Sequence, residues 1–164
     1  MIARLRSALV VLCSSIAAAS PAPAGDLFAG AATVSITPDR PVALWGQMHT
    51  RVSTGVASPV TATVLVLESR DGERSLGTTT FVACDVVAIP DDALAAIRAR
   101  VAESIPGFSV ERIVASATHT HTAPVLVEGV YEIPPAAMQP AEYVEFFALQ
   151  VARAIAEEIG RAHV

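Results

Sequence analysis

The segment Thr118–Thr122 reads Thr-His-Thr-His-Thr and holds two histidines separated by one residue. Imidazole nitrogen is a common zinc ligand, and histidine also carries protons in catalysis. Side chains two residues apart on a strand point to the same side, so His119 and His121 are expected to face one metal ion, or one metal ion and one substrate. The threonines favour extended backbone, and their hydroxyls are suited to orient the ring nitrogens. The alternative is a pair of hydrogen-bonded surface histidines.

A carboxylate, Asp85, follows the apolar run 81–84 and precedes two valines. A charge in such surroundings is costly unless it is paired or bound to a metal. Asp85 is therefore predicted to be an acid–base or metal-binding group, or to orient one of the histidines. The alternative is that it caps the helix that follows. The neighbouring Cys84 is interpreted as a small core residue and not as a nucleophile.

Two further candidates, His49 and Arg51, lie in a polar, irregular loop near Gly46 and Gly55. An imidazole and a guanidinium in a loop that reaches the site are suited to bind an anionic or polar group of a substrate. We therefore predict that His49 and Arg51 bind substrate. The alternative is that both are solvated loop residues.

Hydrophobic periodicity predicts an α/β fold, in which a mixed β-sheet contains a β-α-β crossover and carries flanking helices. Strands are expected over 28–36, 60–68, 78–87 and 110–117, and helices from 90 to the Pro106-Gly107 break and over 141–158. The crossover makes the last two strands parallel, so their C-terminal ends meet at one edge of the sheet, where ligands bind in open α/β sheets. This topology is expected to bring Asp85 towards His119 and His121.

The first 24 residues are predicted to be a signal peptide. Arg4 and Arg6 precede an apolar run of about a dozen residues, and Ala22-Pro23-Ala24 is a suitable cleavage site. The apolar run is short for a membrane span, which needs about 20 residues; an uncleaved anchor is the alternative. We expect a secreted or periplasmic bacterial protein whose mature chain starts near Gly25.

The remaining composition excludes several function classes. Loss of Arg4 and Arg6 changes the formal net charge from −5 to −7, and the chain has no lysine. An acidic chain without a basic run argues against nucleic-acid binding. Cys84 is the one cysteine after residue 24, so neither an intramolecular disulfide nor a cysteine-based zinc cluster is expected.

The C-terminal residues 159–164 are expected to be a non-native tail. Residues 158–164 match a reading-frame translation of a common sequencing-adapter oligonucleotide, and the helical pattern from Pro140 runs straight into them. We therefore expect the natural chain to continue and His163 to carry no function. The strands are expected to pack against a sheet built from later residues, so the open surface predicts aggregation.

Four segments, in this order, resemble the neutral/alkaline non-lysosomal ceramidases and ceramidase-like bacterial proteins. They are Ala31–Pro38 (AATVSITP), the strand Val60–Glu68, Ala83-Cys84-Asp85, and Ser116–Pro124 (SATHTHTAP). The last stretch is the most specific. The resemblance implies that residues 25–158 are the N-terminal part of a ceramidase-like catalytic domain.

What the resemblance implies is a zinc-dependent amidase that hydrolyses the N-acyl amide bond of ceramide or a related substrate. His119 matches the family's zinc ligand, and His121 matches a histidine that assists in the site. The family's other ligands (a further His, a Glu and a Tyr) and its catalytic Ser would lie beyond this chain, which alone is expected to have little or no activity. A lipid substrate is compatible with peripheral membrane contact, and no oligomeric state is predicted.

Because of two departures from the family pattern, the sequence does not fix which substrate the chain binds. Thr122-Ala123-Pro124 stands where the family usually has Ser-Gly-Pro, and Trp45-Gly46-Gln47 replaces a Gly-Tyr type of loop. The alternatives are a metallohydrolase of a non-lipid amide or ester, and a non-catalytic binding module of the same fold.

Overall fold

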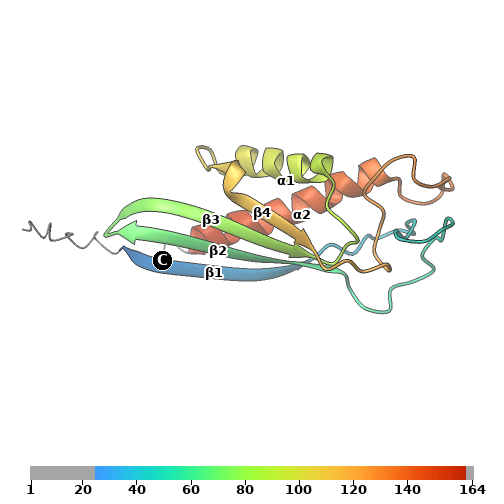
Figure 1. Ribbon diagram of the computed structural model, residues 1–164, viewed down its shortest axis with the longest axis horizontal. Helices are drawn as coiled ribbons and strands as arrows, with labels where there is room; N and C mark the ends of the chain where they lie inside the picture. Colours follow the sequence, from blue (N-terminus) through green and yellow to red (C-terminus); the bar gives the residue numbers. More distant parts are fainter. Residues whose placement is uncertain (1–24, 162–164) are drawn as a thin grey trace, which may run out of the picture.

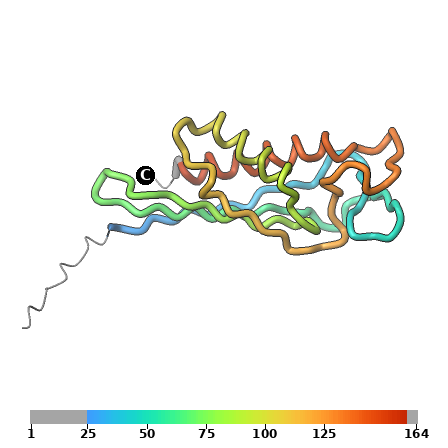
Figure 2. The backbone as a smooth tube through the Cα atoms, turned by 45° about the horizontal axis from the view of Figure 1, so that its top comes forward, coloured from blue at the N-terminus to red at the C-terminus, as the bar shows by residue number. Residues whose placement is uncertain are grey.

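The computed structural model describes residues 25–161, which form a four-stranded sheet with two α-helices on one of its faces (Figures 1 and 2). The sheet order is β1-β2-β3-β4; the first three strands are antiparallel neighbours, and β4 runs parallel to β3. In chain order the elements are β1 (Asp26–Ser35), β2 (Thr61–Asp71), β3 (Arg74–Cys84), α1 (Asp91–Ser104), the 3-10 helix η1 (Val110–Arg112), β4 (Ile113–Ala117) and α2 (Pro140–Arg161). The predicted α/β class and the crossover through α1 are confirmed.

Two of the differences from the predicted boundaries lie at the ends of the parallel strands. β4 starts at Ile113 and not at Val110, because η1 occupies the first three residues of the predicted strand. β3 stops at Cys84, where the Val86 amide donates to the Cys84 carbonyl (2.9 Å) and turns the chain out of the strand.

The predicted terminal segments fall largely outside the described residues. Residues 1–24, the predicted signal peptide, and 162–164 lie beyond the part that the structure describes. Helix α2 continues through Ile159–Arg161, so the start of the predicted tail is helical; its non-native origin stays a prediction. Within residues 25–161 no helix combines the length and the apolar character that a membrane span requires.

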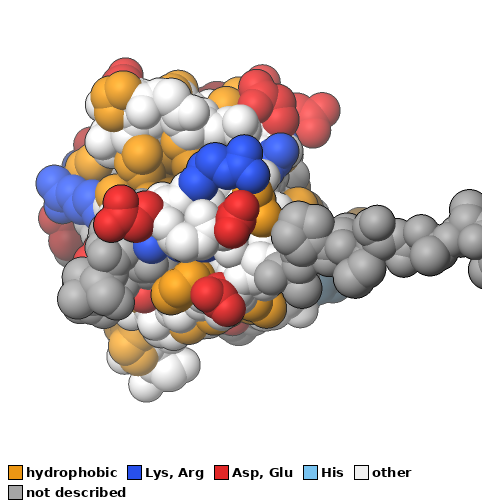
Figure 3. Space-filling model, turned by 90° about the vertical axis from the view of Figure 1, so that its left-hand side faces the viewer, with side chains coloured by type: hydrophobic (Ala, Val, Ile, Leu, Met, Phe, Trp, Pro, Cys, Tyr) orange, Lys and Arg blue, Asp and Glu red, His pale blue; other side chains and the backbone are white. Residues whose placement is uncertain are grey.

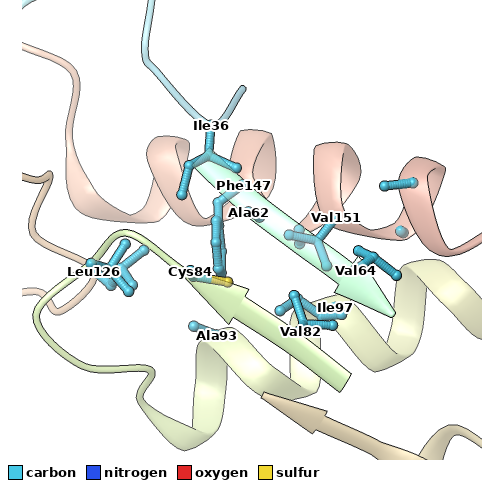
Figure 4. Close-up of a cluster of buried hydrophobic side chains, with 14 of the residues drawn as sticks. Ile36, Ala62, Val64, Val82, Cys84, Ala93, Ile97, Leu126, Phe147 and Val151 are labelled. Carbon is cyan, nitrogen blue, oxygen red and sulfur yellow. The ribbon is translucent and has the colours of Figure 1, made fainter. Parts of the chain in front are cut away.

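The core lies between the sheet and the two helices. Alternate side chains of β2 and β3 point at the helices, and Val64 and Val82 meet Ile97 of α1 and Phe147 and Val151 of α2 (Figure 4). All five are at most 1% exposed. Burial of each such side chain contributes about 1.5–3 kcal/mol, which makes this layer the main source of stability.

The buried hydroxyl of Tyr143 adds a polar tie between α2 and the end of β1. It donates a hydrogen bond of 2.8 Å to the carbonyl of Ile36, so its polar tip is satisfied inside the core.

The opposite face of the sheet carries no helix in the described part of the chain (Figure 1). Leu65 pairs with Phe81, and Phe81 pairs with Val114, so one row of large apolar side chains crosses three strands. Their exposed fractions are 38%, 43% and 50%. We call these three residues the open row. The expectation of an uncovered apolar surface agrees with this arrangement.

The end of the molecule that carries the β2–β3 turn is highly charged. Figure 3 views this end and shows acidic and basic side chains gathered together. Arg70 Nε lies 2.9 Å from Glu68 Oε2, and Arg74 Nη2 lies 3.6 Å from Asp71 Oδ2. The C-terminal ends of β3 and β4, where the histidines follow, lie at the other end of the sheet (Figure 1).

Candidate functional site

The candidate site lies where the parallel strands β3 and β4 end. After Ala117 the chain stays alongside the segment that leaves β3. The Thr118 amide donates to the Cys84 carbonyl (2.9 Å), and the Thr120 amide donates to the Val86 carbonyl (3.3 Å). The topology therefore places the histidine segment and the segment around Asp85 side by side, as the crossover predicts.

The backbone of His119 has a left-handed conformation, with φ of 63°. Such a conformation is uncommon for a residue other than glycine and costs on the order of 1 kcal/mol or more. β4 has already ended at Ala117, so the period of a strand does not set the directions of the two rings. The left-handed turn at His119 brings both rings to one side instead, so strand periodicity was the wrong physical reason for their common direction.

The two imidazole rings meet through their Nε2 atoms. His119 Nε2 and His121 Nε2 are 3.4 Å apart, and the ring planes are inclined by 68°. The other nitrogen of His119, Nδ1, lies 2.8 Å from the carbonyl oxygen of Val87. A carbonyl only accepts, so His119 Nδ1 carries the proton and Nε2 keeps its lone pair directed at His121.

This separation suits two ligands of one tetrahedral zinc ion. Zn–N bonds of about 2.0–2.1 Å at the tetrahedral angle place two nitrogens about 3.3–3.4 Å apart. A backbone carbonyl that accepts from the second ring nitrogen, as Val87 does here, commonly orients a metal-binding histidine. The pair therefore fits zinc, but it provides two ligands. Among residues 25–161, no group of three or more His, Cys, Asp or Glu side chains comes together for a metal.

A loop between β1 and β2 holds His121 from the other side. The Gln47 side-chain amide (3.4 Å) and Arg51 Nη2 (3.0 Å) both donate to the His121 carbonyl. Tyr131 fixes this loop through the backbone of Gln47. Its hydroxyl accepts a hydrogen bond from the backbone N–H of Gln47 (3.0 Å) and donates one to the backbone carbonyl of Gln47 (2.8 Å). These contacts join segments about 70 to 84 residues apart.

Gly46 lies directly against the ring of His121. Its φ is +86°, and a Cβ added there would stand 2.6 Å from His121 Cγ and Nδ1. No side chain fits at this position, so the backbone of Gly46 forms one wall of the histidine site.

We expect Gly46→Ala to lower the zinc affinity of the chain by about 10- to 100-fold, the usual effect of disturbing a group that orients a ligand. The new methyl group must push the His121 ring away from His119, and the left-handed backbone adds strain. Zinc titration by calorimetry measures the change. The matched control is Gly55→Ala in the same loop, where an added Cβ would meet nothing within 4 Å; an equal loss in both variants would contradict the role of Gly46.

Asp85 joins the ends of three segments. Its Oδ2 accepts from the Thr61 amide (2.9 Å) and hydroxyl (2.8 Å), and its Oδ1 accepts from the Thr118 hydroxyl (3.2 Å). Partial burial alone would raise the pKa of Asp85, but the bonds from Thr61 and Thr118 together outweigh it and hold the pKa below its ordinary value. The N-cap of α1 is Pro90, so the alternative that Asp85 caps this helix is wrong.

We expect Asp85→Asn to lower the free energy of unfolding by about 1–3 kcal/mol at neutral pH, because hydrogen bonds to a charged acceptor are lost. The pKa is lowered in the folded chain, so the carboxylate stabilises fully above its ordinary value of about 3.9, and this contribution disappears as the pH falls through the lowered pKa. Urea unfolding of both proteins from pH 7 to pH 3 should show the difference closing in acid. A constant difference across that range would contradict this account.

The other candidates fall at different distances from the rings. Arg51 touches the backbone of His121, whereas His49 is exposed and, within the described residues, donates no hydrogen bond to either ring. Burial, followed by the charge of Asp85, raises the pKa of Cys84 to about 12. That thiol stays protonated at neutral pH, as expected of a core residue. The roles predicted for His49, Arg51 and Asp85 stay predictions.

Several contributors to the site were not among the predicted residues, including Gly46, Val87 and Tyr131. Gly46 and Tyr131 lie in long loops whose packing no local pattern predicts. Val87 contributes its backbone carbonyl, which any residue would supply. The one available signal was the glycine after Trp45, a residue type that accepts positive φ.

Comparison with solved structures places this arrangement within a known fold. The neutral ceramidase of Pseudomonas aeruginosa superposes with a TM-score of 0.70 and 20% sequence identity, over 83% of this chain and 22% of the ceramidase chain. A ceramidase in complex with C2 gives a TM-score of 0.65, also at 20% identity, over 83% of this chain and 21% of that one. No family model matches, and no curated protein matches.

The chain spans about a fifth of the length of these two structures. Its fold is that of part of a ceramidase, which agrees with the resemblance noted in the sequence at the level of architecture.

Proposed function

We propose that this chain is the N-terminal part of an exported zinc-dependent amidohydrolase that cleaves the N-acyl amide bond of ceramide or a related N-acyl substrate. The observation that carries the proposal is the pair of Nε2 atoms, 3.4 Å apart, with His119 Nδ1 held by the Val87 carbonyl. The ceramidase-like fold supports the reaction class. Export rests on the signal-peptide pattern of residues 1–24.

In this proposal each residue has a separate task. His119 holds the ion through Nε2, and the Val87 carbonyl fixes the ring direction. His121 stands beside it, so its Nε2 either completes the metal site or holds a proton for the leaving amine. Asp85 keeps the ends of β2 and β4 together through Thr61 and Thr118. An ion held by His119 and His121 would supply Lewis-acid polarisation of the amide carbonyl and a water of lowered pKa.

The histidine pair needs further ligands to become a hydrolytic centre, since catalytic zinc sites have three protein ligands and one open position. We therefore expect the isolated chain to bind zinc but to release little or no fatty acid from ceramide or from short N-acyl amines. Robust zinc-dependent hydrolysis by residues 25–158 alone would contradict the partial site.

A chimaera tests the function itself. Residues 25–158 would replace the matching fifth of the Pseudomonas aeruginosa ceramidase, and fatty-acid release from ceramide and from short N-acyl amines would be measured. We expect zinc-dependent release that disappears in the His119→Ala chimaera and persists in the Arg112→Gln chimaera, since Arg112 is exposed and lines a separate hollow. A folded chimaera that holds zinc without hydrolysing any of these amides would favour a non-catalytic binding module. Hydrolysis confined to the short N-acyl amines would favour a metallohydrolase of a non-lipid amide.

A further inference from the structure

A hollow of about 590 Å³ reaches Thr122, the residue that follows His121. Its walls come from the segment between β1 and β2 and from the segment after His121, both at the end of the sheet opposite the β2–β3 turn (Figures 1 and 2). The volume is in the range of small-molecule sites, about 300–1,000 Å³. Its apolar lining includes Val42, Leu44, Val52, Val56, Val60 and the ring of Pro124.

The charged groups of this hollow leave one guanidinium without a carboxylate. Asp39, Arg40 and Arg51 line it. Arg40 pairs with Glu142, and its Nε lies 3.7 Å from Asp39 Oδ1, so these charges offset one another. Arg51, by contrast, forms no ion pair with any described residue; its recorded hydrogen bond goes to a neutral carbonyl, that of His121.

One hydrogen bond uses one of the five N–H donors of a guanidinium. The fork of Arg51 therefore keeps donors for a second acceptor, at the rim of an apolar hollow. Guanidinium groups bind carboxylates in a bidentate, charge-assisted manner, and the apolar walls suit an alkyl chain. Neutral ceramide offers Arg51 no such charged partner.

We propose that this hollow binds an amphiphile with a carboxylate next to an acyl chain, and that the preferred substrate is an N-acyl amino acid whose carboxylate pairs with Arg51. The assignment as substrate, but not the binding itself, rests on the proposed function. Arg51 bonds to the backbone of His121, so a carboxylate held by Arg51 lies beside the histidine pair. In an N-acyl amino acid the carboxylate is one carbon from the amide nitrogen, which matches this short separation.

The test compares matched ligands on the full chain by isothermal titration calorimetry, below their micelle concentrations. N-lauroylglycine carries the carboxylate, N-lauroylethanolamine replaces it with a neutral alcohol, and laurate has the carboxylate without the amide. We expect N-lauroylglycine to bind at least about tenfold more tightly than N-lauroylethanolamine, an advantage that raised salt reduces.

Variants of Arg51 decide whether this residue is responsible. Arg51→Gln should reduce the preference to less than about threefold, while Arg51→Lys keeps the charge and most of the preference. Arg112→Gln is the control, since Arg112 is exposed and lines a separate, smaller hollow. Equal binding of the two lauroyl amides, or an unchanged preference in Arg51→Gln, overturns the proposal.

Two further measurements distinguish an N-acyl amino acid from a free fatty acid, and this inference from the proposed function. Tighter binding of laurate than of N-lauroylglycine overturns the substrate assignment in favour of a free fatty acid. His119→Ala should weaken zinc binding at least about 100-fold without changing the carboxylate preference. If the wild type bound no zinc, only the proposed function would be contradicted. If it showed no preference for N-lauroylglycine over N-lauroylethanolamine, only this inference would be contradicted.

Discussion

Zinc affinity should fall by at least about 100-fold when His119 is replaced by alanine. Changing a group that only orients a metal ligand costs about 10- to 100-fold, and removal of the ligand itself costs more. His119 is also the ring whose tautomer the Val87 carbonyl fixes, so its Nε2 is ready to bind without rearrangement. Competition titration with a chromogenic zinc chelator measures the affinity.

His121→Ala should weaken binding as well, because the remaining imidazole would hold the ion alone. The matched control is His49→Ala, which removes an exposed histidine from the neighbouring loop and should leave the affinity unchanged. Equal affinities of His119→Ala and the wild type would show that zinc binds elsewhere, and the proposed function would lose its main support.

The second large effect concerns self-association. The open row of Leu65, Phe81 and Val114 exposes a continuous apolar strip across three strands, so the chain should associate through this face at moderate concentration. Replacing all three by threonine, which keeps a good strand propensity, should weaken association at least about 100-fold. The estimate takes about 1 kcal/mol of lost apolar burial at each position.

Sedimentation velocity over a concentration series measures this change. The control replaces three exposed apolar residues outside the row, Met48, Val56 and Leu76, by threonine. We expect the control to associate like the wild type. If both triple variants became monomeric to the same degree, general surface hydrophobicity would explain the association, and the open row would have no special part in it.

Local patterns were sufficient for the architecture. The alternation around Val64 and the helical stripe through Phe147 and Val151 each reflect a single buried face, and the structure buries all three residues. The stop at Cys84 was not predictable, because the apolar character continues through Val86 and Val87. Both valines are buried outside the strand, so hydrophobicity alone could not mark its end.

The site was predictable in position but not in geometry. The crossover places the ends of β3 and β4 together, and this follows from strand and helix order alone. The left-handed turn at His119 is uncommon for its residue type, and it is maintained by contacts with the segment after β3. The approach of Gly46 to His121 depends on how two long loops pack, and no local pattern encodes that.

The bond between His119 and the Val87 carbonyl joins residues 32 positions apart in the chain. An unfolded chain retains both histidines two residues apart, but it has no partner to fix the tautomer of His119. The histidine pair is thus oriented for a metal ion only when the crossover has closed, and we expect zinc to distinguish the native chain from the unfolded one. A metal that binds only the native state adds its binding free energy to stability. Zinc should therefore act as a folding ligand of this chain, raising its melting temperature in proportion to the logarithm of free zinc.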